Sequence, residues 1–395
     1  MTRGGWLTRR LAGFSKKKCR DVLRGAPPQA RESFRVAPCH ARLKAQPDSP
    51  KGRGVFHSLI ALFLLLASPL PSHARELVVQ SAFPKGMAAL SESEQRITTG
   101  VEQLTDGALS LRFVGAGAIV TPDHLLDAVR DGTVPVAFDW MGFHGDRVPL
   151  AGFIASMPFG PTPRDLAGWI YGGGGMDMLS AAYDRQGIVA LPCHMVLSEA
   201  GGWFNRRIDT PEDFHGLTMR IAGLGAEVLR RMGGHPSSEP PDHLFDALES
   251  GRLEAVEFSV PSTDQSFGFE HFTRYYYFPG WHQPSSLNVL LINQAVWDSL
   301  RESQRVAVRT TCRENVLWNL STSGAQQMNA IDAATQRGVQ VRRFPESVLT
   351  RLRDVSRAVV TETAASDPIL ATAFASLAQH LDKTRRWDTL QTLPR

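Results

Sequence analysis

Apolar and polar positions alternate along the first half of the chain in a way that predicts short strands separated by helices. The expected strands cover residues 77–81, 109–114 and 134–138, and the expected helices cover 87–105 and 121–132. Thr121-Pro122-Asp123 supplies the start of the second helix, and Gly132 supplies its end. A strand–helix–strand–helix–strand order predicts a parallel α/β sheet.

The same kind of pattern then starts again, so the chain contains two α/β units in tandem. Strands are expected at 201–204, 217–221 and 253–258, and helices at 210–213, 225–232 and 243–250. A proline-free helical stretch from Gln294 to about Gln336 is long enough to contact both units. Residues 346–388 are again helical, with a break at Asp367-Pro368.

An unbroken apolar run, Leu59–Ala67, lies near the N-terminus and predicts an export signal. Lys51 and Arg53 precede the run, and Ser72-His73-Ala74 follows it. This order is typical of a Sec-type signal peptide, and the run is much shorter than the roughly 20 residues of a transmembrane helix. We therefore expect residues 51–74 to be a signal peptide that is cleaved after Ala74, and the mature protein to lie in the periplasm.

Residues 1–50 are basic and show no helix or strand period, which leaves two interpretations open. In the favoured one, translation starts downstream of Met1. In the other, the segment is an N-terminal extension, either a long n-region or a leader of the twin-arginine type indicated by Arg9-Arg10.

Charge and composition narrow the class of protein. The chain has 395 residues, a length typical of two domains, and it is 43% hydrophobic and 21% charged, as in ordinary globular proteins. The first 74 residues hold 14 of the 43 Lys and Arg but 3 of the 39 Asp and Glu, so the rest carries a net charge of −7. This acidic body has no clustered basic face, which argues against nucleic-acid binding.

The two cysteines of the globular part, Cys193 and Cys312, lie far apart in the sequence and show no metal or redox spacing. They form either one disulfide, in an oxidising compartment, or two buried thiols.

Arg220 is the strongest candidate for ligand binding, because it interrupts a short apolar strand where an unpaired charge is costly. Its planar guanidinium matches a carboxylate; the alternative is a salt bridge within the protein. Glu257 lies at a strand end, and Glu199 precedes a glycine pair. The chain shows no G-x-S-x-G or H-E-x-x-H motif, so we do not expect an enzyme.

Three segments resemble the solute-binding proteins of TRAP transporters, the DctP family. They are residues 213–221 (DFHGLTMRI), 246–255 (DALESGRLEA) and 275–282 (YYYFPGWH). The last is similar to a run found in the subfamily that binds 2-oxo acids and other monocarboxylates. The resemblance spans most of residues 77–390.

The resemblance implies a two-lobed α/β fold like that of periplasmic binding proteins, with a ligand cleft between the lobes and a long connecting helix. Lobe I would comprise residues 75–198 plus 286–325. Lobe II, with the C-terminal helices, would comprise 199–285 plus 326–395.

The resemblance also implies the residues of the site. Arg220 would pair with the substrate carboxylate, and a sodium or calcium ion would bridge protein and substrate. The cation ligands would be Glu257, Glu199, Phe258 and Gln283. The sequence itself offers Trp203, Trp140 and Phe143 as further substrate-binding candidates, with the alternative that these aromatic residues belong to the core. Glu199 and Phe258 replace the Gln and Trp that are common in this subfamily. A second carboxylate favours a more highly charged ion such as calcium, or else repels a second substrate carboxylate.

The resemblance therefore implies a periplasmic protein that captures a small organic carboxylate for TRAP membrane permease subunits. The late helices would form a homodimer interface, as in some relatives. Two alternatives stay open at this point: an exported α/β enzyme acting on a carboxylate, and a ligand-sensing lobe of a receptor.

Overall fold

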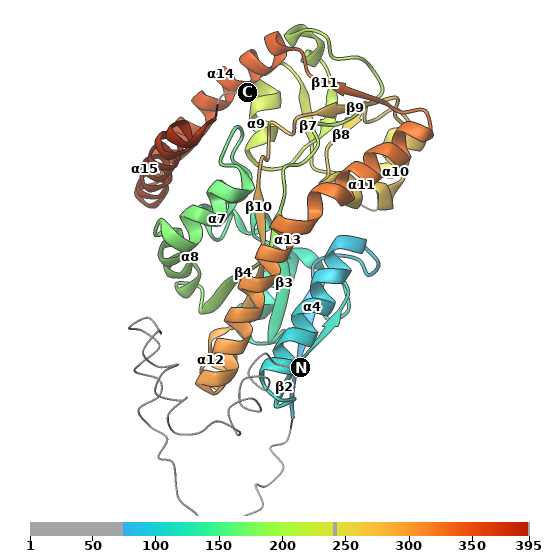
Figure 1. Cartoon of the computed structure of the whole chain (residues 1–395). Helices are drawn as coiled ribbons and strands as arrows, with labels where there is room; N and C mark the ends of the chain where they lie inside the picture. Colours follow the sequence, from blue (N-terminus) through green and yellow to red (C-terminus); the bar gives the residue numbers. More distant parts are fainter. Residues whose placement is uncertain (1–73, 240–242, 394–395) are drawn as a thin grey trace, which may run out of the picture. The chain divides into compact units, whose positions relative to one another are not determined.

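The computed structural model describes residues 74–239 and 243–393, which form two β-sheets with helices packed around them (Figure 1). The expectations for residues 1–50, and those for the signal peptide up to His73, lie outside the described residues. Among the helices of residues 74–239 and 243–393, none combines the length and the apolar character needed to cross a membrane.

The first sheet has five strands in the order β2-β1-β3-β10-β4. Their bounds are β1 Arg75–Ser81, β2 Leu109–Val114, β3 Val136–Trp140, β4 Ile188–Val196 and β10 Ser286–Asn293. As the sequence predicts, β1 is parallel to both β2 and β3. β10 is antiparallel to β3 and β4, because the chain reaches it by returning from the second sheet.

At β4 and β10 both faces of this sheet are buried. Leu290 and Ile292 contact one hydrophobic core, and Val289 and Leu291 contact the other. A strand covered on both sides reads as a continuous apolar run without alternation. For this reason the pattern of the sequence does not reveal β4 and β10.

The second sheet has six strands in the order β11-β9-β5-β8-β6-β7. Their bounds are β5 Gly202–Phe204, β6 Thr218–Arg220, β7 His235–Ser237, β8 Ala255–Val256, β9 Tyr275–Phe278 and β11 Gln340–Arg343. β6 is parallel to β7 and β8, whereas β5 is antiparallel to β8 and β9. β5 is the strand that enters from the first sheet, so each sheet contains one strand that runs against its neighbours.

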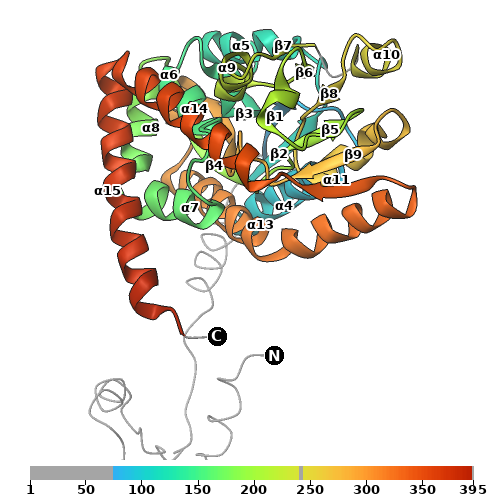
Figure 2. The same ribbon diagram turned by 90° about the horizontal axis from the view of Figure 1, so that it is seen from above.

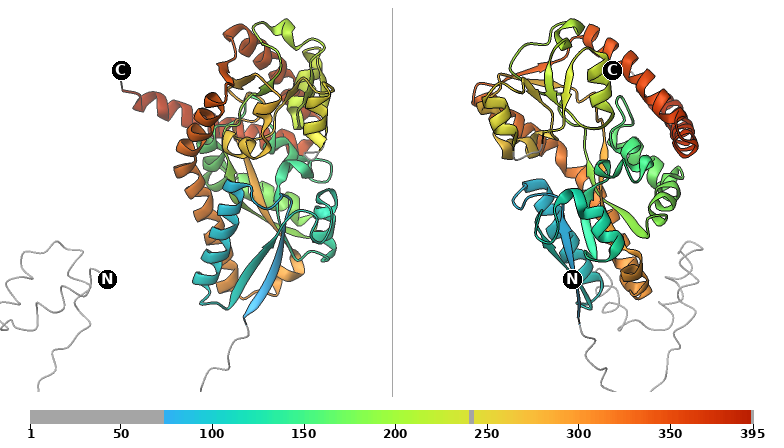
Figure 3. Two further views of the ribbon diagram at one scale, coloured as in Figure 1. Left: turned by 90° about the vertical axis from the view of Figure 1, so that its right-hand side faces the viewer. Right: turned by 180° about the vertical axis from the view of Figure 1, so that it is seen from behind.

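Helices cover the sheets, as three further views show (Figures 2 and 3). The α-helices are α4 Ala88–Leu104, α5 Leu125–Asp131, α6 Pro149–Ala155, α7 Pro163–Gly172, α8 Gly175–Asp184, α9 Gly223–Arg231, α10 Leu244–Glu249, α11 Pro261–Asp264, α12 Gln294–Asp298, α13 Glu302–Gln336, α14 Glu346–Ala365 and α15 Pro368–Gln391. Short 3-10 helices are η3 Pro122–His124, η4 Met141–His144, η5 Pro211–Phe214, η7 Gln265–Phe267 and η8 Phe269–His271.

The long helix α13 connects the two sheets, as expected. Asn315 donates a hydrogen bond to the carbonyl of Cys193 in β4 (2.7 Å). Further along, Gln327 bonds Ser262 of α11 (3.1 Å), and Ala334 enters the core of the second sheet. The helical stretch expected from residue 294 is in fact two helices, α12 and α13, because the chain leaves helical geometry between Asp298 and Glu302.

A disulfide joins Cys193 of β4 to Cys312 of α13. Both cysteines are fully buried in the core between this helix and the first sheet. The structure thus decides between the two alternatives that the sequence left open.

The C-terminal helices do not follow the expectation that all of 326–395 belongs with the second lobe. The first part of α14 packs in the core of the second sheet, but its end joins the core of the first. α15 then lies against α6, α7 and α8, with Leu370, Ala373 and Leu377 in that core. The break at Asp367 allows this, since its side chain caps the new helix at the amides of residues 369 and 370.

Candidate functional site

Two segments cross from one sheet to the other side by side, and we call them the crossing segments (residues 197–201 and 279–285). The amide of Gly280 donates to the carbonyl of Glu199 (3.0 Å), and the amide of Glu199 donates to the carbonyl of Gln283 (3.4 Å). A Cβ at position 280 would collide with the Glu199 backbone, so glycine is required for this close approach. Residues about 80 positions apart therefore meet at one point between the sheets.

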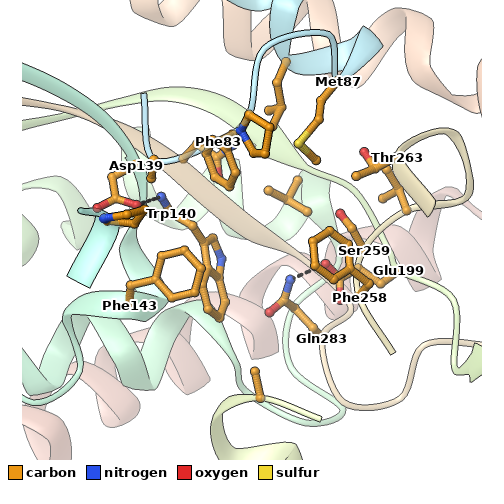
Figure 4. A pocket seen from close by; sticks show the side chains of 18 of the residues that line it. Phe83, Met87, Asp139, Trp140, Phe143, Glu199, Phe258, Ser259, Thr263 and Gln283 are labelled. Atoms are coloured by element: carbon orange, nitrogen blue, oxygen red, sulfur yellow. Dashed lines mark hydrogen bonds between the residues drawn. The ribbon is translucent and has the colours of Figure 1, made fainter. Parts of the chain in front are cut away.

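A cavity of about 1200 Å³ lies beside the crossing segments (Figure 4). Seven of the eight predicted site residues line it: Trp140, Phe143, Glu199, Arg220, Glu257, Phe258 and Gln283. Residues from both sheets contribute, with Trp140 at the end of β3 and Arg220 at the end of β6. The cavity is therefore a cleft between two α/β halves.

Trp203 is the predicted residue that the structure does not bring to this cavity. Its indole is buried at 2% exposure, stacks on Tyr276 with ring centres 3.7 Å apart, and donates to Asp264 (2.9 Å). The assignment of Trp203 to substrate binding is thus wrong for this structure. The tryptophan lies in the middle of the second sheet, where both sides of β5 are covered.

Arg220 and Glu257 form a mostly buried ion pair on the wall of the cavity. Nη1 of Arg220 donates to the carbonyl (2.7 Å) and to Oε1 (3.1 Å) of Glu257, and the guanidinium lies 5.2 Å from the centre of the Phe258 ring. Of the three guanidinium nitrogens of Arg220, only Nη1 makes hydrogen bonds within the described residues. The donors of Nε and Nη2 are therefore unused in that described part of the chain.

His282 is a member of the site that the sequence analysis missed. Its Nε2 lies 3.0 Å from Oε2 of Glu199 and 3.1 Å from Oε2 of Glu257. Gln283 donates to the other oxygen of Glu199 (2.7 Å). The signal that could have revealed His282 is its place next to Trp281 in the aromatic run that carries the family resemblance.

The charged cluster (Glu199, Arg220, Glu257 and His282) is buried enough for its members to control one another. Burial alone would lower the pKa of His282, but the charges of Glu257 and Glu199 outweigh burial and raise the pKa to about 10. Burial raises the pKa of Glu199 to about 7, and the charge of Glu257 adds to the rise. Burial would also raise the pKa of Glu257, but His282 and Arg220 hold that pKa below its usual value.

The two carboxylates of the same cluster, Glu199 and Glu257, offer oxygen atoms of the kind that hold a cation. One ligand atom each from Glu199, Glu257 and His282 lies within 4.8 Å of the others, and all three residues are buried. Carboxylate oxygens suit hard cations such as sodium and calcium. The phenyl ring of Phe258 has no donor atom, so this residue can contribute only its carbonyl oxygen.

Comparison with known protein families identifies the family of this chain. Residues 90–367 match the DctP model, described as bacterial extracellular solute-binding protein, family 7. The chain belongs to the DctP family. This match covers most of the described structure, including every described strand except β1, and it confirms the resemblance drawn from the three sequence segments.

Relatives of this DctP-family protein bind small carboxylates. The monocarboxylate 2-oxoacid-binding periplasmic protein of Nostoc sp. is 25% identical over 313 residues, 79% of this chain and 86% of that protein. A TRAP solute-binding protein of Bordetella bronchiseptica, a mixed-occupancy dimer with calcium and picolinate, is 27% identical with a TM-score of 0.76 (80% and 94% covered). One from Pseudoalteromonas atlantica, with sodium and pyruvate, is 26% identical with a TM-score of 0.75 (81% and 100% covered).

These likenesses confirm the predicted fold class, since both solved structures align over nearly their full length. They also show that members of this fold hold a small carboxylate together with calcium or sodium. The family is one of solute-binding proteins, which agrees with the absence of catalytic motifs in the sequence.

In this DctP-family protein, we expect His194 to make folding stability sensitive to acid. The imidazole is buried in β4, lines the cavity and contacts Ser93 (2.8 Å). Burial lowers its pKa to about 4. Because the unfolded state binds a proton near pH 6.5, stability from this residue is complete above that pH and is lost as the pH falls toward 4.

Between pH 7 and pH 4.5, we expect the wild-type protein to lose about 2–3 kcal/mol more of its free energy of unfolding than His194→Gln loses. Glutamine can keep a hydrogen bond to Ser93 without taking up a proton. Urea unfolding at the two pH values measures the difference, with the exposed His271→Gln as the control. An unchanged acid loss in His194→Gln would contradict the assignment.

Proposed function

We propose that this protein is an exported solute-binding protein that captures a small monocarboxylate of the 2-oxo acid type for the membrane permease of a TRAP transporter. The observation that carries the proposal is Arg220, whose fork lines an interlobe cavity with donors unused by the described residues. The relatives that bind pyruvate and other monocarboxylates support the same ligand class. The protein would act by binding and release, without turnover.

The two lobes would be residues 75–198 plus 286–325, and residues 199–285 plus 326–395. Each of these two sets of residues contains the strands of one sheet, which supports the division. The crossing segments and α13 connect the two sets. Of residues 326–395, α15 would move with lobe I, against which it packs. Ligand would favour the closed form through contacts that both lobes make only when the cleft is shut.

A sodium or calcium ion would bind with the ligand, held by Glu199 and Glu257 and by the carbonyl oxygen of Phe258, with Gln283 next to them. The ion would supply a positive charge between the carboxylates of the protein and the carboxylate of the ligand. The closeness of the Glu199 and Glu257 oxygens supports this ion site, as do the calcium and sodium ions in relatives. His282 would have to give up its contact with both carboxylates, so we expect it to shift when the ion binds.

Export to the periplasm would follow cleavage of a Sec-type signal after Ala74. Two observations support this location. The first strand begins at Arg75, directly after the predicted cleavage point. The buried disulfide is also of the kind that persists in oxidising compartments.

A homodimer would form through the end of α15. Trp387 and Leu390 are exposed there, at 61% and 79%, and large apolar side chains in such a position usually mark a contact surface. The Bordetella relative is a dimer, which supports a homodimer for this protein too.

Native mass spectrometry of the protein purified from its own cells tests these points together. We expect a bound monocarboxylate and one calcium or sodium ion per chain, in a dimer whose subunits begin at Arg75. Calorimetry with pyruvate, with and without calcium, then gives the affinity. Turnover of the released ligand, or no binding of any monocarboxylate, would contradict the proposed function.

A further inference from the structure

The cavity has two chemically different ends. The charged cluster lies at the crossing segments and the end of β6. Across the cavity, from the first-sheet half, an aromatic wall (Trp140 and Phe143) faces it. Figure 4 shows these two side chains on one side of the cavity, with Phe258 and Gln283 on the other. A ligand that spans the cavity therefore meets charge at one end and aromatic surface at the other.

The aromatic wall is held in place by the protein. The indole of Trp140 donates to Ser286 of β10 (2.7 Å), and its ring meets Phe143 edge to face, with centres 4.9 Å apart. On the opposite side, Phe258 packs on Phe267 at 4.3 Å. Both surfaces are therefore ready to receive a flat apolar group without first becoming ordered.

Phe143 is nevertheless 57% exposed. Leaving a phenyl ring in water is unfavourable by roughly 25 cal/mol per Å², and a three-carbon acid held by Arg220 offers little apolar surface to cover it. A ring attached to the acid would cover Phe143 and would pack in the edge-to-face or offset geometry that aromatic pairs prefer.

We propose that the preferred ligand is a 2-oxo acid that carries an aromatic ring, with the carboxylate on Arg220 and the ring against Trp140 and Phe143. The inference rests on the proposed function and refines it, since it names the body of the carboxylate. It also gives the ligand a role in closure, because one molecule contacts the second-sheet half through its acid and the first-sheet half through its ring.

Calorimetry with phenylpyruvate and pyruvate tests the proposal, because these 2-oxo acids differ only in the ring. We expect the wild-type protein to bind phenylpyruvate about 10- to 100-fold more tightly. Phe143→Ala is expected to weaken phenylpyruvate binding much more than pyruvate binding and so to remove most of this preference. Phe143→Leu should keep part of it, and Leu104→Ala, at an equally exposed residue outside the cavity lining, should keep all of it.

The outcomes separate this inference from the proposed function. If pyruvate binds as tightly as phenylpyruvate, the aromatic subsite is wrong and the carboxylate-binding function stands. If Phe143→Ala weakens both acids equally, the ring serves closure of the lobes and the subsite is again wrong. If neither acid binds, the proposed function fails and the inference fails with it.

Discussion

Replacing Arg220 with alanine is expected to raise the dissociation constant for the carboxylate ligand by at least about 100-fold. The guanidinium is 12% exposed and lies among buried groups, so its charge-assisted hydrogen bonds to a ligand are poorly replaced by water. Removing one partner from such a buried pair costs about 2–5 kcal/mol. Calorimetry with pyruvate measures the loss.

The fold is expected to survive this substitution, because Glu257 keeps two other partners. The amide of Ala222 donates to its Oε1 (2.7 Å), and His282 lies beside its Oε2. Circular dichroism checks this point. Arg220→Lys is the matched control, since it keeps the charge and loses the planar fork, and it should bind more weakly than wild type but better than alanine. Affinity within about 3-fold of wild type in Arg220→Ala would refute the assigned role.

Loss of the disulfide is expected to lower the free energy of unfolding by about 4–5 kcal/mol. Cys193 and Cys312 are separated by 119 residues, so the bond removes much of the conformational freedom of the unfolded chain. Urea unfolding of Cys193→Ala/Cys312→Ala, compared with the oxidised wild type, measures the change.

The reduced wild type is the control for side-chain packing, since it keeps both sulfur atoms. It should lose most of the same stability, whereas a reducing agent should leave the double variant unchanged. α13 should stay docked in both, because Asn315 and Asn319 still bond the backbone of β4. Equal stability of oxidised and reduced protein, or free thiols in the native protein, would contradict the prediction.

The fold was predictable where one side of an element is buried. Residues 77–81, 109–114 and 217–221 carry a readable strand pattern, and each is a strand in the structure. β4 and β10 were not predictable in this way, because burial on both faces removes the alternation. The end of α14 and the placement of α15 depend on which sheet offers an open apolar surface, which the period of a helix does not show.

Some residues of the site were likewise predictable from the sequence and others were not. Arg220 stands out in the sequence because a charge inside an apolar strand needs a special environment. His282 does not stand out, since its partners Glu199 and Glu257 are 83 and 25 positions away in the chain. Trp203 has an aromatic side chain like those of the cavity, and only the order of the strands shows that it faces the core.

The sequence by itself determined the α/β units, the family resemblance and an arginine that lines the cavity, because local periodicity and short motifs report what each element must bury or bind. Only the tertiary structure decided that two glutamates and a histidine share one buried point, that two cysteines are joined, and that aromatic side chains face this point across a cleft. The physical reason is that such contacts arise from strand order and from the crossing segments, which bring together residues that the sequence keeps apart.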